Sequence, residues 1–114
     1  MAKPSKEQIL LLDELRDFVI EVMRDMPEWV DAKVERLRSI PLGVLRRNAT
    51  QRHGVTRWKR GVNLHTLQPE DVEVIDIHPK MLNQQWKAYS AFVLHHEYIH
   101  ALGLRAHNAL FRQL

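Results

Sequence analysis

The chain has 114 residues, 45% of them hydrophobic, so it is long enough for one hydrophobic core and too short for two ordinary domains. It contains no cysteine, which excludes a disulfide framework, a thiolate nucleophile, an iron–sulfur cluster and a cysteine-bound zinc ribbon. The formal net charge is +3, but residues 36–69 carry eight basic and no acidic side chains, whereas residues 1–35 carry five basic and nine acidic ones.

The first 41 residues predict a helical hairpin. Ser5 and Gln8 fit a capping box, and apolar residues then recur at helical spacing, which predicts a helix over residues 6–26. Pro27 cannot continue that helix but suits the first turn of another, which we expect to run toward Pro41.

Residues 42–82 predict a small three-stranded sheet. Glycines, turn-prone residues and β-branched or aromatic residues place one strand near 43–47 and another near 55–60. Residues 72–77 alternate Val or Ile with acidic residues, as in a strand with one face in water, and Pro79 ends this strand. We expect the strand near 55–60 to form an edge of the sheet.

Residues 83–114 predict helices that carry a metal site. Asn83 is a suitable N-cap for an amphipathic helix over residues 84–102, and Gly103 is placed to end it. A short helix is expected near the C-terminus. We therefore expect a single α+β domain over residues 1–114. No apolar run approaches the roughly 18 residues of a membrane span, so a cytoplasmic protein without a membrane partner is expected, its oligomeric state left open.

The sequence HEYIH, residues 96–100, matches the HExxH motif of zinc hydrolases. His96 and His100 are four residues apart on the expected helix, so both imidazoles project from one face and suit a single metal ion. Glu97 lies beside them, where it would act as general base and acid toward a zinc-activated water. His95 points about 100° away from His96, which favours a supporting or surface role.

A catalytic zinc site has three protein ligands and leaves its fourth position to water. No Asp or Glu follows Glu97, and His107 is the only downstream histidine. In a continuous helix His107 would lie about 10 Å beyond His100 along the axis, so the chain must turn back, and Gly103 provides the break. The sequence therefore predicts Zn²⁺ bound by His96, His100 and His107.

Four segments in this order resemble the SprT-like zinc metallopeptidases, a family that includes Spartan-type proteases. They are RHGVTRW (52–58), VEVIDIHPKML (72–82), HHEYIH (95–100) and AHNALF (106–111), and the resemblance covers about residues 44–114. The resemblance implies a minimal zincin-like domain: helical hairpin, small sheet, active-site helix and short C-terminal helix.

The same resemblance assigns roles to individual residues. It implies zinc binding by His96, His100 and His107, catalysis by Glu97, and an aromatic side chain, Phe111, packed behind the third ligand. The chain departs from the family at the residue after the third histidine, where Asn108 replaces the usual glycine, in a short loop between the second and third histidines, and in the missing zinc ribbon.

The expected reaction is hydrolysis of a peptide bond in a polypeptide substrate. Substrate would bind as an extended strand added to the sheet edge. The group that stabilises the oxyanion stays open among Arg105, His65 and Tyr89. Trp86, Tyr89 and Phe92 fall at helical spacing and are expected in the core, and His53, His65 and His78 are expected to be ordinary surface histidines.

The basic middle segment suggests single-stranded nucleic acid as a partner, and the resemblance to SprT-like peptidases implies DNA or DNA–protein complexes. Its candidate residues are Arg46, Arg47, Arg52, Arg57, Trp58, Lys59 and Arg60. A charged hairpin that protects an exposed edge from aggregation explains the same charges equally well. Two competing functions remain: a nucleic-acid-binding module with a structural three-histidine zinc, and a scaffold that has lost activity.

Overall fold

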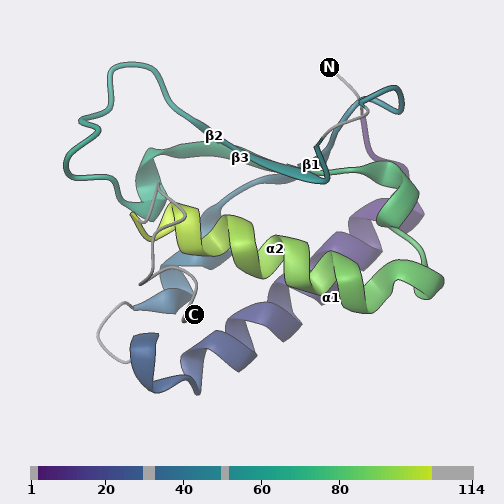
Figure 1. Ribbon diagram of the computed structural model, residues 1–114, viewed down its shortest axis with the longest axis horizontal. Coiled ribbons are helices and arrows are strands. Elements are labelled where there is room, and N and C mark those ends of the chain that lie inside the picture. The colour runs from purple at the N-terminus through teal and green to yellow at the C-terminus, as the bar shows by residue number, and fades with distance from the viewer. Residues whose placement is uncertain (1–2, 30–32, 50–51, 104–114) are drawn as a thin grey trace.

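Two α-helices lie on one face of a small sheet in the computed structural model, which describes residues 3–29, 33–49 and 52–103 (Figure 1). They are α1 (Lys6–Arg24) and α2 (Lys87–Ala101). The expected α+β class is confirmed. In this part of the chain no helix is long and apolar enough to cross a membrane.

The sheet has three strands: β1 (Leu42–Val44), β2 (Gly54–Trp58) and β3 (Val72–Ile77). The central strand is β3, which pairs parallel with β1 and antiparallel with β2. Both the three-stranded sheet and the position of β2 at an edge are confirmed. Strands β1 and β2 are shorter than expected at their C-terminal ends because β3 spans only six residues and offers no further ladder partner.

The N-terminal part follows the prediction only in its first helix. The capping box of α1 is present: the Gln8 amide donates to Ser5 Oγ (3.1 Å) and the Ser5 amide donates to Gln8 Oε1 (2.8 Å). A single second α-helix was wrong, since the described residues there form two 3-10 segments, Pro27–Trp29 and Val34–Ser39. Lys33 has a left-handed backbone (φ 54°), which an α-helix cannot contain.

The hydrophobic core fixes α2 from two sides. Ile75 and Ile77 of β3 are fully buried on the helical face of the sheet, while Leu94 and Tyr98 of α2 are fully buried in the same cluster, together with side chains of α1. Each fully buried aliphatic side chain of this kind contributes about 1.5–3 kcal/mol to folding. Helix α2 therefore has little freedom to rotate or slide.

The start of α2 is tighter than expected. Asn83 is a cap, as predicted, and its Oδ1 accepts a hydrogen bond from the Trp86 amide (3.1 Å), but it opens a 3-10 turn, Gln84–Trp86, that leads into α2. Gly103 follows the helix with φ 108°, the left-handed region in which glycine ends helices. The expected short C-terminal helix lies outside the described residues.

Candidate active site

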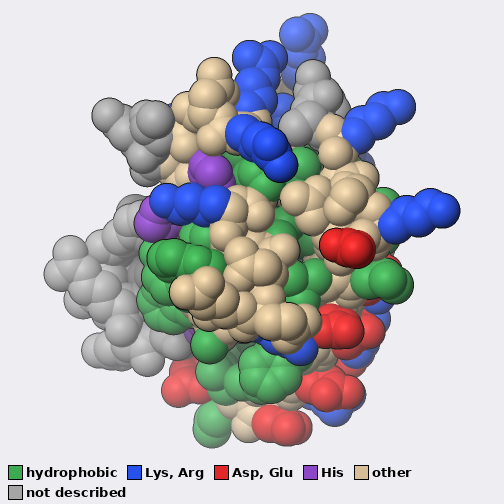
Figure 2. Space-filling model, turned by 90° about the vertical axis from the view of Figure 1, so that its right-hand side faces the viewer, with side chains coloured by type: hydrophobic (Ala, Val, Ile, Leu, Met, Phe, Trp, Pro, Cys, Tyr) green, Lys and Arg blue, Asp and Glu red, His purple; other side chains and the backbone are tan. Residues whose placement is uncertain are grey.

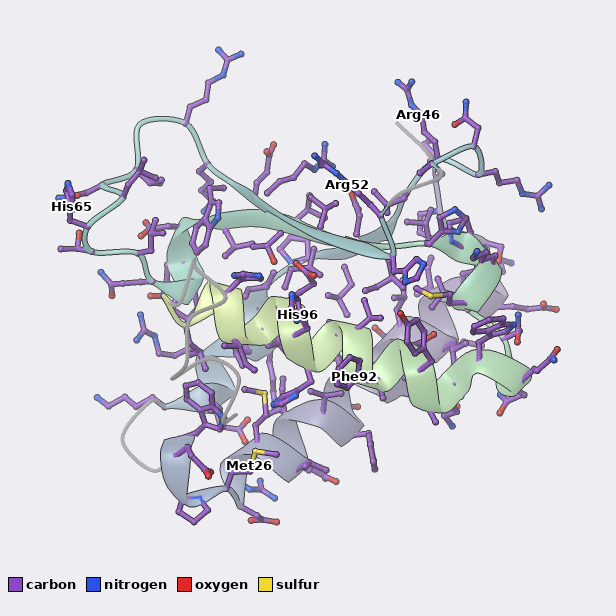
Figure 3. The ribbon with its side chains drawn as sticks, in the orientation of Figure 1. Met26, Arg46, Arg52, His65, Phe92 and His96 are labelled. Carbon is purple, nitrogen blue, oxygen red and sulfur yellow. The ribbon has the colours of Figure 1, made fainter. Side chains whose placement is uncertain are left out.

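His96 and His100 project from α2 into one cleft beneath β2. Their ring centroids are 4.9 Å apart with the ring planes at 77°. Both rings line a cleft of ≈ 470 Å³, and His96 points from α2 toward the sheet (Figure 3). The structure thus brings the two imidazoles together, as the motif predicts.

Glu97 lies between α2 and the edge strand. Its side chain is largely buried, and the Thr56 hydroxyl of β2 donates to its Oε1 at 2.8 Å. The same hydroxyl lies 3.2 Å from the main-chain carbonyl oxygen of Glu97. A hydrogen bond to a carboxylate oxygen is stronger than one between neutral groups, so this contact favours the observed orientation of the Glu97 side chain. Thr56 was missed as a site residue, although strand alternation places it on the same face as Gly54 and Trp58.

Gly54 allows β2 to approach α2 closely. A Cβ atom added at this position would lie 2.7 Å from Val93 Cγ1 and 3.3 Å from Glu97 Cγ. The first distance is far below van der Waals contact between carbon atoms, at ~3.5–4.0 Å. Any side chain at position 54 would therefore force β2 or Val93 to shift.

The described residues supply two of the three ligands that a catalytic zinc site needs, His96 and His100. Two imidazoles one helical turn apart match the ligand pair of a tetrahedral zinc site. In residues 3–29, 33–49 and 52–103, no three His, Cys, Asp or Glu side chains gather as a metal-binding group. Elsewhere in the chain only Asp31 and His107 have such side chains, and both lie outside the described residues. The third ligand is therefore still a prediction.

The remaining histidines occupy different environments. His53 and His65 are exposed, as expected. His78 is not the surface residue that we predicted: it is buried, its Nε2 lies 2.8 Å from the Ala49 carbonyl oxygen, and its Nδ1 accepts from the Lys80 amide. His95 is partly buried, which lowers the pKa of its imidazole and favours the neutral form.

Three aromatic residues of the α2 region are exposed, so the expectation of a core position was wrong. Trp86, Tyr89 and Phe92 are exposed by 40%, 38% and 64%. The helical spacing was real, but the core and β2 cover other faces of α2 and leave this face open. Tyr89 and Phe92 line a second cleft of ≈ 290 Å³, whose wall also includes His96 and Glu97.

The three candidates for oxyanion stabilisation differ in their position relative to the cleft. His65 lies on a loop far from His96 (Figure 3). Arg105 lies outside the described residues. Tyr89 lines the second cleft beside Glu97, and its hydroxyl lies 2.7 Å from His53 Nδ1. Arg52, which was considered only for nucleic acid, lines both clefts and joins Tyr89 as a candidate.

The basic residues are divided between two environments. Arg46, Arg47, Arg52, Lys59 and Arg60 are exposed. Figure 2 shows Lys and Arg side chains gathered at the sheet end of one face, with Asp and Glu side chains toward α1. Arg57 instead pairs with Asp76 (2.9 Å), a carboxyl whose pKa burial raises, while Trp58 packs against the core on the opposite side of β2. Trp58 is therefore not set among the exposed cations as a stacking platform.

No known protein family, curated protein or solved structure matches the chain. The class that the structure defines is an α+β domain in which an HExxH helix runs beneath an edge strand. The side chains in the cleft are therefore the evidence for function.

We expect Gly54→Ala to destabilise the fold by about 1–3 kcal/mol, because the new methyl group collides with Val93. Urea denaturation followed by circular dichroism measures the change. In a protein that already carries Val93→Ala, the Gly54→Ala substitution should lower the free energy of unfolding by less than it does in the wild type. A Gly54→Ala variant as stable as the wild type would contradict the close approach.

Proposed function

We propose that the protein is a zinc-dependent metallopeptidase in which Glu97 is the general base and acid. The observation that carries the proposal is the placement of a buried, hydrogen-bonded carboxylate between two imidazoles and a sheet edge. The resemblance of the motif order to SprT-like peptidases supports the same function.

His96, His100 and His107 are the residues that would hold the ion. Bound zinc would polarise the scissile carbonyl and make a water molecule acidic near neutral pH. Glu97 takes one proton from the water whose oxygen attacks the carbonyl carbon. As the carbon–nitrogen bond breaks, Glu97 returns this proton to the leaving amine. Thr56 holds the Glu97 carboxylate in the orientation that both transfers require.

The substrate backbone would bind along β2. In the described part of the chain β2 pairs only with β3, so no described strand occupies its other edge. Gly54, Val55 and Thr56 of this strand line the cleft with Glu97. A polypeptide added as a further strand would place its main chain over the carboxylate, with recognition that depends little on sequence.

Glu97→Gln should abolish hydrolysis and retain zinc. The amide keeps the size of the side chain but accepts no proton, so we expect a fall in kcat of at least about 10²–10⁴. Cleavage of an unfolded protein, with zinc content measured in parallel, tests this. A variant that still cleaves at the wild-type rate would exclude Glu97 as the base.

His107→Ala should greatly weaken zinc binding, because it leaves two histidine ligands. Elemental analysis of protein prepared without added metal should find about one zinc per chain in the wild type. His65→Ala, which changes an exposed histidine far from His96, is the control and should retain the metal. Wild-type protein that fails to bind added zinc would exclude the peptidase.

Thr56→Val should lower kcat by about tenfold or more, since a hydrogen bond to a charged group contributes ~1.5–3 kcal/mol. Thr56→Ser keeps the hydroxyl and should retain most of the activity. Both variants should bind zinc as the wild type does, because Thr56 is not a proposed ligand. Equal rates for the Val and Ser variants would show that the hydroxyl does not position Glu97.

A nucleic-acid-binding function is the second candidate. It is favoured by the exposed cations at the sheet end of the molecule, where Arg46 and Arg52 both lie (Figures 2 and 3). In a pure binding module Glu97→Gln would change nothing, so the Glu97 experiment also separates the two candidates. The two functions are compatible if DNA brings protein substrates to the cleft.

A further inference from the structure

Three aromatic rings form a row immediately before the metal-site histidines. The rings of Trp86 and Tyr89 meet edge to face with centroids 6.0 Å apart, and those of Tyr89 and Phe92 stack with centroids 6.2 Å apart. Phe92 precedes His96 by four residues, one helical turn. Exposed large aromatic side chains in a contiguous group are typical of binding surfaces.

The cleft at this row continues into the proposed active site. Arg52, Gly54, His96 and Glu97 line both clefts. Its volume of ≈ 290 Å³ is just below the ~300–1,000 Å³ of small-molecule sites, a size suited to one large side chain. The occupant we infer is therefore part of the same ligand that meets Glu97.

The walls of this cleft are joined by contacts between α2 and His53, the residue that precedes β2. The His53 ring meets the Tyr89 ring edge to face, and Tyr89 Oη lies 2.7 Å from His53 Nδ1. Gly54, which also lines the cleft, has no side chain, and this lets β2 lie directly against Val93 and Glu97. The cleft is thus formed before any ligand arrives.

The distance from Phe92 to His96 fits a peptide bound along β2. The four residues from Phe92 to His96 rise about 6 Å along the helix axis. Two residues of an extended strand span about 6.6 Å, and alternate side chains point to the same face. A side chain at most two positions from the scissile bond would therefore reach Phe92.

We propose that Tyr89, Phe92 and Val93 form a specificity subsite for a large aromatic side chain of the substrate. This inference rests on the proposed peptidase function and names the residue that the enzyme selects. The rings of Tyr89 and Phe92 provide stacking surfaces, and Arg52 on the rim can stack on an aromatic ring while it repels Lys and Arg.

The test uses the full zinc-loaded chain and two short peptides of Ala, Ser and Gly, identical except that one contains a single Phe. The wild type should cleave the Phe peptide with kcat/KM about tenfold or more above the Phe-free peptide. Mass spectrometry should place the cut within two residues of the Phe. Phe92→Ala should lower this ratio to about twofold or less.

Phe18→Ala is the matched control, since Phe18 is exposed to a similar extent (57%) but lies on α1 and lines neither cleft. It should keep the wild-type ratio. A wild-type ratio near one, or an unchanged ratio in Phe92→Ala, would overturn the subsite.

Failure of the proposed function is recognised separately. If the wild type cleaves neither peptide, binding of the same fluorescently labelled peptides to Glu97→Gln protein, with and without added zinc, decides the subsite by anisotropy. Tighter binding of the Phe peptide that is lost when Phe92→Ala is added supports the subsite. Equal binding of both peptides overturns it.

Discussion

The close approach of β2 to α2 sets the geometry of both clefts. Gly54 makes the approach sterically allowed, because a Cβ atom there would lie 2.7 Å from Val93 Cγ1. Two residues later, the Thr56 hydroxyl then comes within 2.8 Å of Glu97 Oε1. A wider spacing would leave the Glu97 carboxylate in water, with many rotamers and no fixed direction. The unpaired edge of β2 would also lie too far from the helix for one peptide to contact both.

The HEYIH segment combines cleft-lining residues and core residues in five positions. His96 and His100 line the cleft, whereas Tyr98 and Ile99 are buried in the core. Burial of Tyr98 raises the pKa of its phenol, so the hydroxyl stays neutral. The rotation of α2 about its axis is therefore determined by the core, and the direction of both imidazoles follows from it.

Local patterns in the sequence were enough to predict the helix of the motif, the strand at residues 72–77 and the edge position of β2. The same patterns could not predict the contacts between segments that are distant in the sequence. Thr56 and Glu97 are 41 residues apart, and nothing near either residue signals the hydrogen bond between them. Helical spacing placed Trp86, Tyr89 and Phe92 on one face of the helix but could not show that these side chains are exposed. Lys33 has the left-handed backbone that interrupts the expected second helix. Because this position is not glycine or asparagine, the residues that commonly adopt this conformation, the interruption could not be predicted from the sequence.

Burial of Glu97 also has a consequence for the entropy of the proposed reaction. A free glutamate side chain loses about 1.5–2 kcal/mol of rotamer freedom when it is ordered. Here that loss accompanies folding, because the contact with Thr56 joins elements that the core already holds together. Substrate binding would then order the peptide, while the carboxylate needs little further ordering to reach its working position.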